Sequence, residues 1–186
     1  IGSATAFELA KRGYKTLNID KLPASGYGST SNSCAIVRAH YSTWDGVAMA
    51  YEGFFYWDDW NKYLEVEDER GMAKYMKTGS IMFMLKGADH SKKSLNLFKE
   101  IGVEHEIWDL ETLKKKMPIY SHDSYNGTSR PDEDDSFFDK SGDQIEGAVW
   151  TPGSGYVSDP QLATHNLQVA TEAKGGEFLF DAEITE

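Results

Sequence analysis

The chain has little cysteine, no long apolar run and few basic residues relative to acidic ones. Cys34 is the single cysteine among 186 residues. One cysteine forms neither an internal disulfide nor a cysteine-based metal site, so a reducing compartment is favoured and we predict a cytoplasmic protein. No apolar run reaches the roughly 18 residues that a membrane-spanning helix needs, so we predict no membrane span.

The charge balance excludes whole classes of partner. Lysine and arginine number 19 against 30 acidic residues, which leaves a formal net charge of −11. Nucleic acids and anionic membranes bind basic surfaces, so we predict neither as a partner. The composition is 40% hydrophobic, enough for a globular core of one domain or slightly more. The chain has no initiator methionine, and we expect it to be a piece of a longer one.

The first 20 residues have the order of a nucleotide-binding unit. Residues 3–12 show helical apolar spacing, Gly13 supplies a helix stop, and residues 14–20 form a short strand that ends in Asp20. Gly2 precedes Asp20 by 20 − 2 = 18 positions, close to the interval between dinucleotide-turn glycines and the acid that binds ribose. Gly2 would then be the third glycine, which lets helix and strand pack closely. An ordinary helix–strand pair with an incidental acid is the alternative.

The remaining pattern alternates helices and strands. A loop rich in glycine and serine spans residues 22–34, and Arg38 and Tyr41 lie on a possible helix start. The aromatic stripe of residues 46–66 predicts one long helix that packs into the core. Further helices are predicted at 91–102, 109–118 and 159–176, and strands near 81–85, 147–157 and 177–186.

One segment differs from the rest in composition. Thr128 to Glu146 holds seven acids against Arg130 and Lys140. We interpret it as a solvated surface insertion, with a weak cation site as the less favoured alternative. No metal site is predicted.

Four segments, in order along the chain, resemble one enzyme family. They read IGSATAFELAKRGYKTLNIDK, GSTSNSCAIVRAHYS, KTGSIMFM and GAVWTPGSGYVSDPQLATHNLQVATEAKGGEFLF. The chain is similar to FAD-dependent amine oxidoreductases of the D-amino-acid oxidase and sarcosine oxidase type, which include dimethylglycine dehydrogenase. The stretch IVRAHYSTWDGVAMAYEGFFYWDDW looks particularly like the sarcosine oxidase β-subunit branch.

The resemblance implies an α/β fold in two parts. Residues 1–40 and 150–186 would form a discontinuous, Rossmann-like FAD-binding domain. Residues 41–149 would supply a helical segment and part of a mixed-sheet substrate domain, with the acidic insertion at 128–146. The oligomeric state is not readable from the sequence.

The resemblance also assigns FAD-binding positions. These are Gly2, Asp20, Lys21, Ser29, Thr30, Ser31 and Ile184. Gly2 stands at the last glycine of the dinucleotide turn, and Asp20 at the acid that binds the adenosine ribose, with Lys21 beside it. The serine and threonine positions match the loop along the pyrophosphate and flavin, and Ile184 falls in the strand whose backbone contacts adenine.

The implied reaction is oxidation of a small secondary or tertiary amine, such as an N-methyl amino acid, by hydride transfer to FAD. Arg38 matches an arginine that holds the substrate carboxylate, and Tyr41 would line the same pocket. We expect Arg38 to be buried, since Ile36 and Val37 precede it. Three alternatives stay open: a structural ion pair for Arg38, a non-catalytic subunit with a decayed site, and an NAD-dependent dehydrogenase.

Overall fold

The computed structural model describes residues 1–87, 89–126 and 130–185, which fold into helices and strands and confirm the predicted α/β class. The chain divides into two compact units. Unit 1 consists of Ile1–Val37, Glu52–Thr78 and Gly155–Glu186, although Glu186 itself is outside the described residues. Unit 2 consists of Arg38–Tyr51 and Gly79–Ser154.

This division differs from the predicted domains at residues 38–40 and 150–154, which belong to unit 2, and most of all in one longer segment. The sequence analysis placed all of residues 41–149 together, whereas Glu52–Thr78 belongs to the same compact unit as the two ends of the chain. The pairing of one unit with FAD and the other with substrate remains a prediction.

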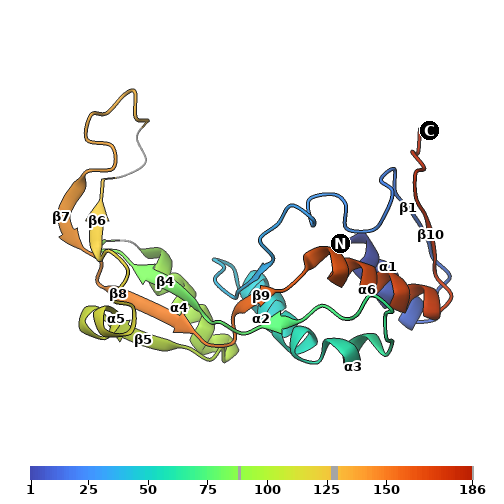
Figure 1. Cartoon of the computed structure of the whole chain (residues 1–186). Coiled ribbons are helices and arrows are strands. Elements are labelled where there is room, and N and C mark those ends of the chain that lie inside the picture. Colours follow the sequence, from blue (N-terminus) through green and yellow to red (C-terminus); the bar gives the residue numbers. More distant parts are fainter. Residues whose placement is uncertain (88, 127–129, 186) are drawn as a thin grey trace. The chain divides into compact units, whose positions relative to one another are not determined.

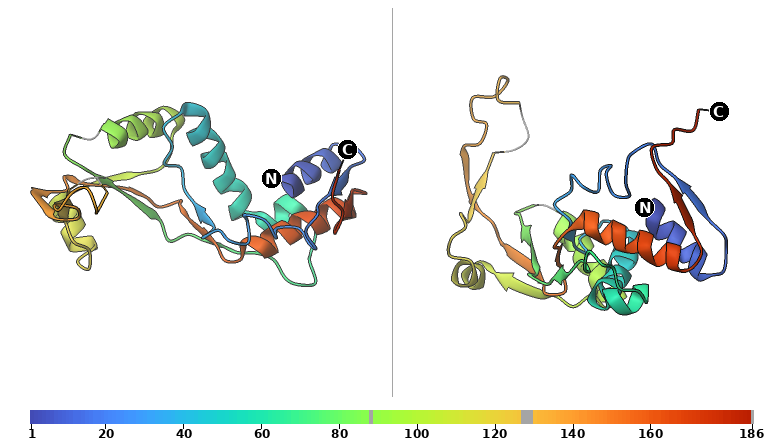
Figure 2. Two further views of the ribbon diagram at one scale, coloured as in Figure 1. Left: turned by 90° about the horizontal axis from the view of Figure 1, so that it is seen from above. Right: turned by 45° about the vertical axis from the view of Figure 1, so that its right-hand side comes forward.

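Two helices form the centre of unit 1. Helix α1 (Gly2–Lys11) and helix α6 (Pro160–Ala173) lie side by side in Figures 1 and 2. Helix α6 begins where the sequence predicted, because the Asp159 side chain accepts a hydrogen bond from the Leu162 N–H (2.8 Å) and Pro160 occupies the first turn.

The strands that follow these two helices pair with each other. Strand β1 (Leu17–Ile19) and strand β10 (Glu177–Leu179) are parallel, with Ile19 opposite Leu179 (Figure 1). The prediction of a strand through residue 186 was too long, since β10 ends at Leu179. The carboxyl ends of both strands therefore meet at one edge, and Asp20 is the first residue beyond β1.

A second sheet of unit 1 has the order β2-β9-β3 and is antiparallel. Its strands are β2 (Ile36–Val37), β9 (Gly155–Val157) and β3 (Tyr75–Met76). One hydrophobic core packs this sheet against the helices. Its buried residues are Phe7, Trp60, Leu64, Ala73, Val157, Ala163 and Ala170.

The predicted single helix at residues 46–66 is two helices. Helix α2 (Trp44–Asp58) is separated from helix α3 (Trp60–Leu64) by Asp59, whose φ of −115° and ψ of 41° are not helical. The core assignment of the aromatic stripe holds for Phe54, Trp60 and Leu64, which are buried. It is wrong for Met49, which is 74% exposed.

Unit 2 is built on a three-stranded antiparallel sheet. Its order is β4-β8-β5, formed by β4 (Ser80–Met84), β8 (Gly147–Thr151) and β5 (Glu106–Asp109). Trp108 and Trp150 stack across neighbouring strands with ring centroids 5.2 Å apart. Helices α4 (Asp89–Ile101) and α5 (Leu110–Lys116) complete the unit.

The acidic segment contributes a hairpin that the sequence analysis did not predict. Strand β7 (Lys140–Gln144) pairs with β6 (Asp123–Tyr125), and the Lys140 Nζ lies 2.5 Å from Asp123 Oδ2. Every residue of β7 is exposed, as expected of a solvated segment. Thr128, where the insertion was predicted to begin, is outside the described residues.

The described residues contain neither a metal-binding cluster nor a membrane-spanning helix. No group of three or more His, Cys, Asp or Glu side chains in them is arranged to hold a metal ion, so the acidic segment carries no cation site there. No helix among them has the length and apolar character needed to cross a bilayer.

Candidate functional site

A cavity of about 370 Å³ lies where β1 and β10 end in unit 1. We call it the Asp20 cavity. Five pieces of chain line it: the start of α1 (Ile1, Gly2, Ser3), β1 with its end (Leu17, Asn18, Ile19, Asp20), the loop (Ser25, Gly26, Gly28, Ser29, Thr30), Thr164 of α6, and Phe178 and Phe180. Four residues predicted to bind the cofactor are thus brought together: Gly2, Asp20, Ser29 and Thr30.

The backbone holds Asp20 firmly while its side chain stays exposed. Its N–H donates to the Leu179 carbonyl (3.0 Å), and its own carbonyl accepts from the Ala182 N–H (3.1 Å). One carboxylate oxygen, Oδ1, accepts from the Leu22 N–H (3.0 Å). Oδ2 has no hydrogen-bond partner in the part of the chain that the structure describes. Asp20 therefore presents a fixed acceptor to the cavity.

The first turn of α1 adds backbone donors. Within the part of the chain that the structure describes, no side chain caps this turn, and no acidic side chain lies in it. The N–H groups at a helix start carry partial positive charge and bind anions such as phosphate. Asp20 and the residues of the α1 start therefore line one cavity.

The predicted steric role of Gly2 stays a prediction. A Cβ at this position would meet no heavy atom of the described residues within 4 Å. A glycine that the fold does require is Gly26. Its φ is +81°, and a Cβ would lie 3.1 Å from the Thr164 Cβ.

Gly26 and Thr164 are site residues that the sequence analysis missed. Gly26 brings the loop against α6, and Ser25 Oγ donates to Gln168 Oε1 one turn further along that helix (2.8 Å). The glycine-rich composition of the loop was a usable signal for Gly26. No local signal pointed to Thr164, because its contact with the loop depends on how distant segments pack.

A second, apolar cavity of about 260 Å³ adjoins the first. It shares Ile1, Thr30 and Thr164 with the Asp20 cavity. Its other lining residues are almost all apolar: Ala35, Ile36, Val37, Trp57, Val157, Pro160, Ala163 and Leu167. A polar and an apolar compartment thus meet at Thr30, both within unit 1.

Three predicted cofactor residues do not line the Asp20 cavity. Lys21 Nζ lies 3.5 Å from Glu183 Oε1, and both side chains are exposed. Ser31 Oγ donates to the Gly28 carbonyl (3.0 Å) and so stabilises the loop. Ile184 lies beyond β10 and is 71% exposed. Their predicted contacts with a cofactor remain predictions.

Arg38 and Tyr41 belong to unit 2, and the local predictions about them were wrong. They are not on a helix start, since α2 begins at Trp44. Arg38 is exposed, not buried, although the next two residues, Ala39 and His40, are buried. Among the described residues Arg38 has no ion-pair partner, so the structural ion pair is not observed either. Tyr41 is 45% exposed, and its carbonyl accepts from Ser94 Oγ (3.3 Å).

The buried polar residue of this segment is His40. It is 8% exposed, its Nε2 lies 2.9 Å from Thr151 Oγ1, and its ring stacks on Phe98 with centroids 5.4 Å apart. Burial, aided by the positive charges of Arg38 and His90, lowers the pKa of His40 to about 4. His40 is therefore a neutral core residue at physiological pH.

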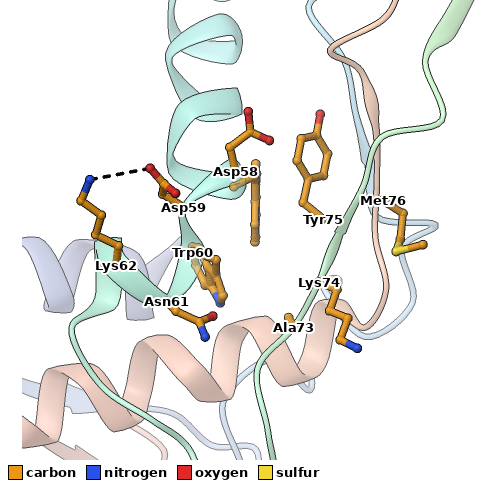
Figure 3. A pocket seen from close by; sticks show the side chains of 10 residues that line it. Asp58, Asp59, Trp60, Asn61, Lys62, Ala73, Lys74, Tyr75 and Met76 are labelled. Carbon is orange, nitrogen blue, oxygen red and sulfur yellow. Dashed lines mark ion pairs between the residues drawn. The ribbon is translucent and has the colours of Figure 1, made fainter.

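Unit 1 has a further large cavity, of about 490 Å³, that contains none of the predicted site residues (Figure 3). We call it the Trp57 cavity. Asp58 and Tyr75 lie on its two sides, and Lys62 pairs with Asp59 (3.9 Å). Lys77 Nζ lies 2.6 Å from Asp58 Oδ2. Both carboxylates thus already face a lysine, and the size of this cavity is not by itself evidence of a site.

A comparison with known families assigns the chain as a whole. Residues 1–186 match the family model described as DAO, FAD dependent oxidoreductase. The chain belongs to the FAD-dependent oxidoreductase family. FAD is the cofactor of this family, which removes the basis for an NAD-dependent dehydrogenase. No curated protein matches the chain.

Solved structures share the fold at low identity. An L-proline dehydrogenase from P. horikoshii is 21% identical over 100% of this chain and 42% of its own, with a TM-score of 0.74. A glycine oxidase from Geobacillus kaustophilus is 20% identical over 99% of this chain and 45% of its own, with a TM-score of 0.68. An L-amino acid deaminase from Proteus myxofaciens is 14% identical over 96% and 35%, with a TM-score of 0.64. The chain thus spans less than half the length of these structures.

Proposed function

We propose that unit 1 supplies part of the FAD site, with the Asp20 cavity taking the adenosine ribose and pyrophosphate. One observation carries the proposal: the free Asp20 oxygen, the uncapped start of α1 and the Gly26–Thr30 loop line one cavity. A carboxylate accepts hydrogen bonds from ribose hydroxyls, and helix-start amides bind phosphate. The adjoining apolar cavity suits a flat, largely apolar ring system.

The test is flavin retention in the full-length protein. Asp20→Ala removes the acceptor and is expected to weaken FAD affinity at least tenfold, since a charge-assisted hydrogen bond is lost (about 1.5 to 3 kcal/mol). Glu177→Ala is the matched control, because Glu177 is an exposed acid on β10 outside the cavity. Equal FAD affinity in the Asp20 variant and wild type would refute the assignment.

We further propose that the protein oxidises a small amine with a carboxylate, such as an N-methyl amino acid. The resemblance to the sarcosine oxidase type supports it, as do structural neighbours that include an L-proline dehydrogenase and glycine oxidases. FAD, when bound, accepts the hydride. In this proposal Arg38 holds the substrate carboxylate, since a guanidinium without an ion-pair partner among the described residues is available for two parallel hydrogen bonds. Tyr41 lines the substrate site.

Anaerobic mixing with substrate tests this activity. Sarcosine, dimethylglycine and proline are added to the oxidised full-length enzyme, and bleaching of its visible flavin absorbance reports reduction. Arg38→Lys is expected to raise KM and lower kcat/KM while FAD content stays unchanged. No bleaching by any amino acid or N-methyl amine would favour the second candidate, a non-catalytic nucleotide-binding subunit with a decayed site.

A further inference from the structure

A cavity of about 420 Å³ is lined by the loop and the start of α6, and it shares only Ser25 with the Asp20 cavity. We call it the Arg70 cavity. Its polar lining includes Ser25 and Tyr27 from the loop, Arg70, and Asp159 and His165 of α6 and its cap. Leu162 adds an apolar wall. The volume is in the lower range of small-molecule sites.

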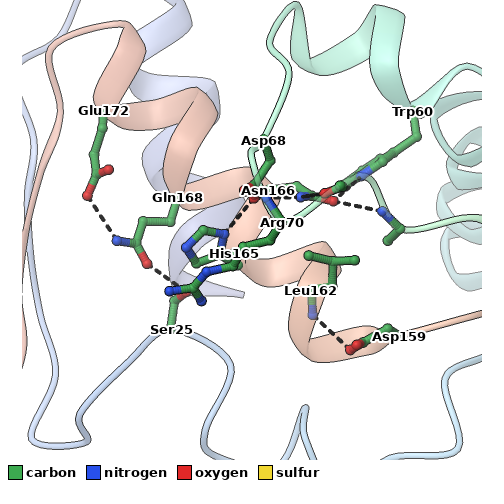
Figure 4. A network of polar contacts seen from close by, with 12 residues as sticks. Ser25, Trp60, Asp68, Arg70, Asp159, Leu162, His165, Asn166, Gln168 and Glu172 are labelled. Atoms are coloured by element: carbon green, nitrogen blue, oxygen red, sulfur yellow. Dashed lines mark hydrogen bonds and ion pairs between the residues drawn. The ribbon is translucent and has the colours of Figure 1, made fainter.

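The cation of this cavity is uncommitted. In a chain with 30 acidic residues, Arg70 has no carboxylate within ion-pair distance among the described residues. Its backbone N–H is bound to Asp68 Oδ1 (2.9 Å), which fixes the start of the side chain. Figure 4 shows the Arg70 side chain extending past His165 toward Ser25. An arginine held at its backbone and open at its guanidinium is suited to bind a planar anion.

The neighbouring ring is held in place by a buried carboxylate. His165 Nδ1 lies 2.5 Å from Asp68 Oδ2, and Asp68 is itself 9% exposed (Figure 4). Asn166 Nδ2 donates to the same oxygen (2.8 Å). The carboxylate of Asp68 is thus occupied by its own partners, and it orients the His165 ring in the cavity wall.

The charge count of the lining decides which anion fits. Arg70 is the one permanent cation of the lining, and Asp159 is a carboxylate in the same wall. The Asp159 charge is directed in part at the helix start, because Oδ1 accepts from the Leu162 N–H. A phosphate dianion would need more positive charge than this lining offers. A monocarboxylate needs one guanidinium, which it meets in bidentate geometry.

We propose that the Arg70 cavity is a second small-molecule site, which binds a monocarboxylate through the Arg70 guanidinium. The Tyr27 hydroxyl supplies a further donor, and Leu162 packs on the apolar part of the ligand. The Ser25 hydroxyl proton stays on Gln168 Oε1. Ser25 lines both this cavity and the Asp20 cavity.

Propionate is the probe, titrated into the full-length protein at constant ionic strength and followed by saturation-transfer NMR of the propionate signals. Arg70→Gln is expected to weaken the binding at least tenfold, which corresponds to about 1.4 kcal/mol. Lys74→Gln makes the same charge change at an exposed residue of unit 1 outside this cavity and should leave the titration unchanged. All titrations are made in an Arg38→Gln background, which removes carboxylate binding at the predicted substrate site, so the signal reports the Arg70 cavity alone.

The outcomes are distinct. Loss of propionate binding in the Arg70 variant alone, with unchanged thermal stability, supports the site. Three results would overturn it: no propionate binding in wild type, equal binding in wild type and Arg70→Gln, or inorganic phosphate binding more tightly than propionate through Arg70. None of these depends on whether FAD occupies the Asp20 cavity or whether the protein oxidises amines.

Discussion

The core of unit 1 and the core of unit 2 are stabilised by different kinds of interaction. The core of unit 1 contains a fully buried asparagine, Asn166, whose side chain makes four hydrogen bonds (Figure 4). The core of unit 2 combines an antiparallel sheet with the stacked rings of Trp108 and Trp150. Hydrogen bonds are directional and stacked rings are less so, which makes the position of α6 in unit 1 the more narrowly specified.

Asn166 connects α6 to two other parts of unit 1. Its Nδ2 donates to Asp68 Oδ2 (2.8 Å) and to the Gly71 carbonyl (2.9 Å). Its Oδ1 accepts from the Ala73 N–H (2.9 Å) and from Trp60 Nε1 (3.3 Å). Thr164 and Gln168 of the same helix hold the loop that lines the Asp20 cavity. The polar core therefore supports the wall of the proposed cofactor site.

We expect the largest effect on stability when the Asn166 hydrogen bonds are removed. Asn166→Leu leaves the Ala73 N–H and the Trp60 indole N–H without acceptors in a buried place, and we expect a loss of about 4 kcal/mol in the free energy of unfolding. Chemical denaturation of the full-length protein measures it. Asn61→Leu, at an exposed asparagine of α3, is the control and should change stability little. A loss below about 1 kcal/mol would show that α6 does not depend on the polar core.

Unit 2 should instead be sensitive to backbone crowding in its sheet. Gly147 begins β8 with a φ of +153°, and a Cβ there would lie 2.2 Å from the Trp108 carbonyl oxygen. Gly147→Ala is expected to cost about 3 kcal/mol, because a strand backbone must move. Gly102→Ala, at a φ of +86° with no atom within 4 Å, should cost only about 1 kcal/mol. Equal losses at the two glycines would contradict the crowding argument.

The buried His40 should make the stability of unit 2 depend on pH. Its folded-state pKa of about 4 lies below the ordinary value of 6.5, so the unfolded state binds the proton first as pH falls. The contribution of neutral His40 to the free energy of unfolding is present above pH 6.5 and declines toward pH 4. The free energy of unfolding falls by about 2 kcal/mol between pH 7.5 and pH 5. Denaturant midpoints measured across this range for wild type and His40→Gln test it. The slope should be smaller in the variant, and parallel curves would exclude His40 as the cause.

The smallest expected effect concerns the cap of α6. Asp159→Ala removes the acceptor for the Leu162 N–H and should cost about 1 kcal/mol. Asp159→Asn keeps a capping oxygen and should retain most of the stability. If both variants lose the same amount, the charge of Asp159 matters more than its hydrogen bond. Thermal unfolding of the full-length protein is sufficient to rank them.

Some of the site could be read from local sequence. The helix before Gly13, the acid after a short strand and the Asp159–Pro160 start of α6 are local patterns, and the structure has them at the predicted places. Each depends on interactions between residues close in the chain, such as a side chain capping the next helical turn. For the same reason the glycine-rich loop could be predicted to line a cavity.

Local sequence did not reveal which residues the fold would bury. Ile36 and Val37 suggested a buried Arg38, but the neighbouring His40 is the buried residue and Arg38 is exposed. The interruption at Asp59 likewise divides a stretch whose apolar spacing predicted one helix. Burial and helix ends depend on partners distant in sequence, which local periodicity does not identify.

The sequence by itself indicated the helices and strands of an α/β chain and the two elements that present Gly2 and Asp20, because periodicity, capping and turn chemistry act over a few residues. The family came from the resemblance of four segments, which the family model confirms. Only the tertiary structure decided that β1 pairs with β10, that Gly26 contacts Thr164, and that Arg70 lines a cavity without an ion-pair partner in the described chain. These features join segments far apart in the chain. Their physical cause is the packing of α6 against α1 and the loop, which no single segment encodes.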